Sequence, residues 1–187
     1  MRKLLLFMHI SLDGFAAGPN GEMDWIIVDE TIFDLASGRT NEADTALYGR
    51  ITFDMMDSYW PTAAQQPGAT KHDVEHSAWY NSVDKVVMSR SMKDKELKRT
   101  TIISDNLAQN INQIKRRKGK NIIMFGSPGA AHSLMKEDLI DGYWLFVNPV
   151  LLGKGIPLFG GIEQVRRLRF VSSNAFSSGV ICLNYEK

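Results

Sequence analysis

The sequence has one cysteine among its 187 residues, so it can form neither an intrachain disulfide nor a cysteine-rich metal site. Cys182 lies in an apolar-leaning run, and we expect a buried, inert thiol rather than a nucleophile. No apolar run approaches the roughly 20 residues that span a bilayer. His9, Ser11 and Asp13 also interrupt the apolar start before a signal-peptide pattern develops. We therefore expect a cytoplasmic protein that does not bind membranes.

The sequence also lacks an excess of charge of one sign. It has 22 Lys and Arg and 21 Asp and Glu, which gives a formal net charge of +1. This balance gives no overall field that would collect nucleic acid, and we expect no such partner. The basic run 115–118 is interpreted as solvated side chains that complement a helix C-terminus. Any anion site must therefore be local.

Three motifs are missing as well. Neither Gly-x-Gly-x-x-Gly after the first predicted strand nor Gly-x-x-x-x-Gly-Lys-Ser/Thr is present, which argues against a Rossmann dehydrogenase and a P-loop NTPase. His72 and His76 are four residues apart on a predicted helix but lack the Glu of His-Glu-x-x-His. We expect no metal site.

What is present is an alternation of short apolar runs and helical segments. Strands are expected at residues 4–10, 45–48, 85–89, 100–104, 121–125 and 142–147. Helices are expected at 29–37 with Gly38 as the stop, at 52–57, at 72–81, from Asn106 as N-cap to 118, and at 130–136. Loops are expected at 14–23 with a turn at Pro19-Asn20-Gly21, at 60–70 and at 149–161.

The chain is expected to end in strands at 165–173 and 179–185, paired antiparallel across a turn near Ser177-Ser178. Strands alternating with helices, followed by a hairpin, predict a mostly parallel mixed sheet with an antiparallel edge. The length of 187 residues suits one α/β domain over residues 1–187.

Three predicted strands end in small or hydroxyl residues beside a cation or a helix start, namely Gly49-Arg50, Ser89-Arg90 and the run 126–130. The carboxyl ends of parallel strands meet at one sheet edge, so we expect these residues to form one cleft. A helix start at Pro128 offers free N–H groups to a diphosphate, and arginines suit phosphate oxygens. The alternative also stays open: the run 126–130 would then be an ordinary strand-to-helix turn, and Arg50 and Arg90 would be surface arginines.

Ten segments in order along the chain resemble the bacterial dihydrofolate-reductase-like proteins of the riboflavin-biosynthesis reductase (RibD C-terminal) type. They are residues 3–15, 21–25, 47–50, 59–61, 86–90, 125–127, 139–141, 149–153, 157–159 and 178–180. The resemblance implies the three-layer dihydrofolate-reductase-like fold. It also implies an NADPH-dependent oxidoreductase acting on a small polar, pyrimidine- or pteridine-like substrate, similar to 5-amino-6-(5-phosphoribosylamino)uracil reductase or to dihydrofolate reductase.

The resemblance further assigns residues to NADP(H). Ala17 and Gly18 fall in the loop over the nicotinamide, and Ser89 and Arg90 match the segment that receives the adenosine 2′-phosphate. The remaining expected cofactor residues hold the other phosphates: Gly49, Arg50, Thr52, Gly126, Ser127, Pro128, Gly129 and Ala130.

At the substrate end, the resemblance places Asp13 at the mouth of the pocket, as a catalytic and substrate-binding candidate, and Trp25 in the adjoining loop. Folate reductases carry an acidic residue shortly after that tryptophan, where Asp29 and Glu30 stand here, so Glu30 is a second catalytic candidate. Tyr59, Trp60 and Phe159 are candidate aromatic walls.

Structural alternatives stay open for these residues. Asp13 could be a turn residue before Gly14, and Trp25 could be a residue of the hydrophobic core. Asp29 and Glu30 are acidic residues of the kind that stabilise a helix N-terminus. His9 is expected to point toward the cofactor edge as a satisfied strand histidine rather than a catalyst.

Three functions therefore remain: a reductase of the RibD type, a dihydrofolate reductase, and a non-catalytic NADP(H)-binding stress or regulatory protein. We expect a homodimer, because closed homodimers are the commonest assemblies. The terminal strands and the run Trp144–Val147 are the predicted dimer surface.

Overall fold

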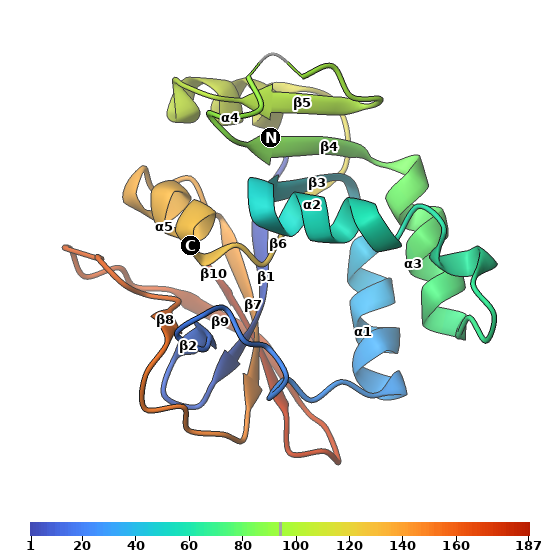
Figure 1. The fold of residues 1–187 in the computed structure, drawn as a ribbon. Coiled ribbons are helices and arrows are strands. Elements are labelled where there is room, and N and C mark those ends of the chain that lie inside the picture. Colours follow the sequence, from blue (N-terminus) through green and yellow to red (C-terminus); the bar gives the residue numbers. More distant parts are fainter. Residues whose placement is uncertain (94) are drawn as a thin grey trace.

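The computed structural model describes residues 1–93 and 95–187, and one eight-stranded sheet organises them (Figure 1). The strand order across the sheet is β5-β4-β3-β6-β1-β7-β10-β9. In chain order these strands are β1 (Leu4–Ser11), β3 (Ala43–Gly49), β4 (Asp84–Met88), β5 (Thr100–Ile103), β6 (Asn121–Phe125), β7 (Gly142–Asn148), β9 (Arg169–Ala175) and β10 (Ile181–Glu186).

The pairing confirms the predicted topology. Strands β1 and β3–β7 run parallel, whereas β10 pairs antiparallel with both β7 and β9. A second, two-stranded sheet joins β2 (Phe15–Ala17) to β8 (Ile156–Pro157). Both short strands lie in segments that were expected to be irregular, so the loops 14–23 and 149–161 are tied to each other.

Helices cover both faces of the sheet. They are α1 (Glu30–Thr40), α2 (Arg50–Tyr59), α3 (Lys71–Ser82), α4 (Leu107–Arg116) and α5 (Pro128–Lys136), with a short 3-10 helix at Ala63–Gln65. Ile111 of α4 and Leu134 of α5 pack in one core layer. Phe53 of α2, Trp79 of α3 and Ile32 of α1 pack in layers that also hold Phe7. The result is the three-layer architecture that the resemblance implied.

Several predicted boundaries were wrong. Gly38 does not stop α1, which continues to Thr40, because Ala36 and Thr40 are both buried and a mid-helix glycine costs only about 1 kcal/mol. The ninth strand begins at Arg169 rather than at residue 165. Helix α2 is also longer than the expected 52–57.

The basic run at the end of α4 is only partly solvated. Lys115 is buried, and its Nζ lies 2.6 Å from Asp141 Oδ2 and 3.2 Å from the carbonyl of Leu139. The prediction of a solvated side chain was therefore wrong for Lys115, which ties α4 to the start of β7. Arg116, Arg117 and Lys118 are exposed, as expected.

The run Trp144–Val147 was predicted to supply a dimer surface, and the fold contradicts this. Trp144 and Phe146 are buried under α1 together with Ile32, and Arg39 covers the Trp144 ring at 3.9 Å. Cys182 lies in the same layer and is 1% exposed, which confirms the expected burial, and that burial raises the pKa of its thiol to about 12. Among the described residues, no helix is long and apolar enough to cross a membrane.

Candidate functional site

A cleft of about 1270 Å³ opens at the carboxyl ends of the parallel strands. It follows the sheet edge in the order β5, β4, β3, β6 and β1, so Ser104, Ser89, Gly49, Gly126 and His9 line it in succession. The predicted strand ends therefore converge in one cleft. All the expected cofactor residues line it except Gly18, whose neighbours Ala17 and Pro19 do.

Three helices point their N-termini into this cleft without a side-chain cap. The N-cap residues are Gly49 for α2, Asn106 for α4 and Ser127 for α5, and none of them accepts a capping hydrogen bond. The two α-helices that begin elsewhere are capped by side chains, α1 by Asp29 and α3 by Thr70. Free N–H groups and the positive dipole ends of three helices are thus directed at one space, which suits an anion with several phosphate groups.

Gly49 allows two of these helix starts to lie side by side. A Cβ on Gly49 would overlap Ser127 Oγ and would lie 3.3 Å from Ala130 Cβ. Ser127 itself has φ 58° and ψ 72°, a left-handed conformation that is costly for a non-glycine residue, and it follows Gly126 at φ 55°. Such strain concentrates at binding sites, where the surrounding structure holds it.

The cations of the cleft differ in their pairing. Arg50 forms an ion pair with Asp54 on the next turn of α2, with 2.9 Å between Nη1 and Oδ2. Arg90 is exposed and has no ion-pair partner among the described residues. The single carboxylate that lines the described cleft is Asp105, at the β5 end. Arg50 and Arg90 therefore lie in the part of the cleft that β3 and β4 form.

The other end of the cleft is apolar. It is lined by Phe7, Ala16, Met23, Ile26, Met55, Met56, Phe125 and Ile156. His9 stands among these residues, with its ring stacked on Phe146 at 4.8 Å between centroids. Burial lowers the pKa of His9 to about 4, so the imidazole is neutral at pH 7.

Asp13 lies beside the cleft rather than in its lining. Its carboxylate accepts hydrogen bonds from the backbone N–H groups of Gly153 at 2.7 Å and Leu152 at 3.2 Å, and from Ser11 Oγ at 2.6 Å. These bonds hold the pKa of Asp13 below its usual range. Asp13 thereby anchors the segment that leads to Ile156 and β8.

The other expected substrate residues also lie outside the cleft lining. Trp25 donates from its indole N–H to the carbonyl of Glu22, and Tyr59 donates to Asp73 at 2.8 Å. Trp60 packs against His76, and Phe159 lies 6.2 Å from Tyr143 between ring centroids. Glu30 is an exposed residue in the first turn of α1, beside Asp29, which is the N-cap.

Some cleft residues were not predicted from the sequence. Met55 and Met56 lie one turn after Thr52 on α2, and the predicted helix 52–57 already contained them, so their helical spacing from Thr52 was a signal that could have found them. Asn106 and Leu107 line the cleft because β5 ends on the same edge as β4. Met23 and Ile26 carry no local signal, since they reach the cleft through the fold of the 14–28 segment.

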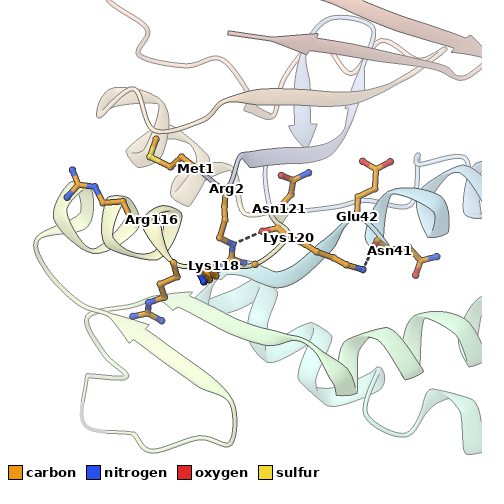
Figure 2. Close-up of a pocket in the computed structure, with 10 residues that line it drawn as sticks. Met1, Arg2, Asn41, Glu42, Arg116, Lys118, Lys120 and Asn121 are labelled. Atoms are coloured by element: carbon orange, nitrogen blue, oxygen red, sulfur yellow. Dashed lines mark hydrogen bonds between the residues drawn. The ribbon is translucent and has the colours of Figure 1, made fainter.

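A second hollow, of about 670 Å³, lies at the amino ends of the parallel strands (Figure 2). Its cations include Arg2, whose guanidinium is bonded to Asp44, Thr45 Oγ1 and the carbonyl of Lys120. Lys120 Nζ donates to the carbonyl of Asn41 at 2.9 Å. Arg2 and Lys120 are therefore engaged within the protein, whereas Arg116, Arg117 and Lys118, which also line the hollow, are exposed. No cluster of three metal-ligating side chains occurs among residues 1–93 and 95–187.

Comparison with known proteins adds to this picture. Residues 2–182 match the family described as the RibD C-terminal domain. The uncharacterized protein YyaP of Bacillus subtilis (strain 168) is 34% identical over 189 residues, covering 98% of this chain and 94% of YyaP. YwjB of the same strain is 30% identical over 182 residues, covering 96% of this chain and 95% of YwjB.

Solved structures share the fold. A putative riboflavin biosynthesis protein from Shewanella sp. PV-4 has a TM-score of 0.71 at 24% identity, covering 98% of both chains. A pyrimidine reductase-like protein from Corynebacterium diphtheriae has a TM-score of 0.68 at 15% identity, covering 99% of this chain and 91% of the other. A diaminohydroxyphosphoribosylaminopyrimidine deaminase/5-amino-6-(5-phosphoribosylamino)uracil reductase from Thermotoga maritima has a TM-score of 0.66 at 15% identity, covering 99% of this chain and 56% of the other.

Proposed function

The chain belongs to the family of RibD C-terminal domains, and from this premise we propose that it is an NADPH-dependent reductase of a small pyrimidine- or pteridine-like substrate. The reaction would resemble that of a 5-amino-6-(5-phosphoribosylamino)uracil reductase, the activity in the name of the Thermotoga maritima protein.

The observation that carries the proposal is the convergence of three uncapped helix N-termini on one cleft, beside Arg50 and Arg90. NADPH has a diphosphate and a 2′-phosphate, so its charge fits these donors. Gly49 and Ser127 both line the cleft, and the absence of a Cβ at Gly49 lets the start of α5 lie against the start of α2. When bound, NADPH supplies the hydride.

The preference for NADPH over NADH is assigned to Ser89 and Arg90. Both line the cleft just beyond β4, and Arg90 has no acidic partner among the described residues that would compete for its charge. Arginine binds phosphate oxygens through two parallel N–H donors. We therefore assign the 2′-phosphate to this end and the diphosphate to the starts of α2 and α5.

At the other end, the chain itself provides an apolar pocket for the acceptor. Phe7, Met55, Met56 and Phe125 form its walls on one face of the sheet, and the β2–β8 pair borders it through Ala17 and Ile156. Apolar walls of this kind exclude water and align the hydride donor with the hydride acceptor. Asp13 acts in this assignment by holding the 152–156 segment in place.

Dihydrofolate reduction is the second candidate reaction. It is less favoured, because neither Asp29 nor Glu30 lines the described cleft: Asp29 Oδ1 is engaged by the N–H of Ile32 at 2.9 Å, and Glu30 is exposed. A non-catalytic NADP(H)-binding protein is the third candidate. The apolar space beside the proposed nicotinamide position favours a reductase over it, because a pure cofactor sensor needs no second pocket.

We further propose a cytoplasmic homodimer that uses β9 as its surface. This strand is one edge of the sheet, it is seven residues long, and its Phe170 is 55% exposed. An exposed apolar edge strand is a template for pairing with another chain. Size-exclusion chromatography with light scattering tests the dimer, for which we expect twice the mass of the chain. A monomer at micromolar concentration would contradict the proposal.

The function is tested by calorimetry and by NADPH oxidation. We expect NADPH to bind more tightly than NADH, and its absorbance at 340 nm to fall with at least one member of a panel of pteridines, pyrimidine ribosylamines and quinones. Tight NADPH binding without oxidation on the whole panel would favour the non-catalytic candidate. Absence of NADPH binding would contradict the proposal.

A further inference from the structure

His9 is the one ionisable side chain that lines the apolar end of the described cleft, and its surroundings fix which of its nitrogens carries the proton. The key neighbour is Asn148, at the end of β7, which pairs with β1. Asn148 is fully buried. Its amide is oriented by the backbone on both sides.

Asn148 Oδ1 accepts a hydrogen bond from the N–H of Ile27 at 2.8 Å. Its Nδ2 donates to the carbonyls of Phe146 at 3.0 Å and Ile10 at 3.3 Å. An oxygen cannot donate and an NH₂ group cannot accept, so these three bonds permit only one amide orientation. The NH₂ group is therefore the part of Asn148 that faces His9.

That NH₂ group lies 3.4 Å from His9 Nδ1. An NH₂ group cannot accept a hydrogen bond, so a proton on Nδ1 would face it without an acceptor, and Nδ1 is therefore the unprotonated nitrogen of the neutral ring. The proton is on Nε2. Because Nδ1 and one ring face are engaged by Asn148 and Phe146, Nε2–H is the polar group that His9 presents to the cleft.

We propose that His9 Nε2–H donates a hydrogen bond to a carbonyl oxygen of a flat, uncharged acceptor ring bound in the apolar end of the cleft. This inference rests on the proposed function and names its substrate class. Asn148 is the positioning residue that holds the imidazole in the donating tautomer.

Three features of the pocket select this class. No Lys or Arg and no carboxylate lines the apolar end among the described residues, so an ionised ring would be desolvated there without a partner. Thioether and aromatic side chains of Met23, Met55, Met56 and Phe7 favour flat, polarisable rings. Burial keeps His9 neutral, so it acts as a hydrogen-bond donor and not as a cation.

The inference is tested first without any substrate, by NMR of ¹⁵N-labelled histidine in the full-length protein. The His9→Gln variant identifies the His9 signals among those of the four histidines. We expect the neutral Nε2–H tautomer in the wild type, with no protonation above pH 5. A neutral Nδ1–H tautomer, or titration near pH 6.5, would overturn the assignment, whether or not NADPH binds.

The second test adds ligands to the same sample. NADP⁺ is added to saturation, and then menadione, lumazine and uracil, three uncharged rings with carbonyl groups, are added singly. We expect at least one to shift the Nε2 resonance, and we expect 2-hydroxy-1,4-naphthoquinone, an anion at pH 7, not to. A shift with NADP⁺ alone and none with any ring would assign the hydrogen bond to the cofactor and overturn the proposal.

Variants complete the design. His9→Leu removes the donor at similar volume, whereas His9→Gln places an amide NH₂ near the position of Nε2–H. We expect His9→Leu to lower kcat/KM for the responsive ring by at least about tenfold, with NADPH affinity unchanged and partial recovery in His9→Gln. Equal kcat/KM in wild type and His9→Leu would contradict the role of His9 while leaving the proposed function intact. If the wild type does not bind NADPH, that result contradicts the proposed function instead.

Discussion

Arg90 gives the sharpest test of cofactor choice, because its predicted partner is the one group that distinguishes NADPH from NADH. Arg90→Ala removes a charge-assisted hydrogen bond to the 2′-phosphate, worth about 1.5–3 kcal/mol. Arg90 is exposed, and solvent screening at 0.15 M salt favours the lower end of that range. We therefore expect NADPH affinity to fall by roughly tenfold, while NADH affinity barely changes.

Two further variants serve as controls for Arg90. Arg50 is paired with Asp54 and lies at the start of α2, so Arg50→Ala should weaken NADPH and NADH by the same factor. Arg167 is exposed and outside the cleft, so Arg167→Ala should change neither affinity.

Isothermal titration calorimetry of the three variants and the wild type at 50 and 300 mM NaCl gives these affinities. The salt dependence of NADPH binding should be weaker in Arg90→Ala than in the wild type, because one phosphate contact is lost. Equal losses of NADPH and NADH affinity in Arg90→Ala would refute the assignment of the 2′-phosphate to this residue.

Four other outcomes are expected. Gly49→Ala keeps an allowed backbone at φ −79°, but its Cβ overlaps Ser127, so we expect a loss of stability of about 1–3 kcal/mol together with weaker NADPH binding. Gly129→Ala, whose Cβ meets no protein atom within 4 Å, should raise the melting temperature slightly and still weaken NADPH binding; unchanged binding in Gly129→Ala would place the diphosphate elsewhere. Asp13→Asn should raise KM for the acceptor and leave NADPH affinity unchanged, because it weakens the anchoring of the 152–156 segment; an unaltered KM would leave Asp13 as a turn residue. Burial lowers the pKa of His76 to about 3, below its ordinary value of 6.5, so the unfolded chain binds more protons between these pH values and stability falls as pH falls from 6.5 toward 3, by up to about 1.4 kcal/mol per pH unit. His76→Phe should flatten that slope in denaturant titrations from pH 7 to 4, and an unchanged slope would contradict this origin.

The sheet was predictable because each strand between Leu4 and Phe125 is a short apolar run beside a turn or helix signal, and such signals are local. The C-terminal hairpin was predictable from alternation within one stretch of chain. The pairing of β2 with β8 was not, because each has two or three residues and gains its strand conformation from a partner about 140 residues away. Trp144 was misjudged for a similar reason, since its cover comes from α1.

The same distinction between local sequence signals and long-range contacts applies to the candidate site. Gly49, Arg90 and Gly126 carry a local signal, since each follows a buried strand, and they line one cleft. The 2′-phosphate role of Arg90 remains a prediction from the resemblance. The tautomer of His9 depends on Asn148, 139 residues later, and the carboxylate of Asp13 is engaged by Gly153, 140 residues later. Contacts at such separation leave no pattern in the neighbouring sequence.

A crystal structure of the protein grown with NADP⁺ tests the central claim most directly, because it locates every phosphate at once. We expect the diphosphate within hydrogen-bond distance of the backbone N–H groups at the starts of α2 and α5, the 2′-phosphate at Ser89 and Arg90, and the nicotinamide toward His9 and Ala17. NADP⁺ bound in the basic hollow around Arg2 and Lys120, or on no ordered site at millimolar concentration, would contradict the account.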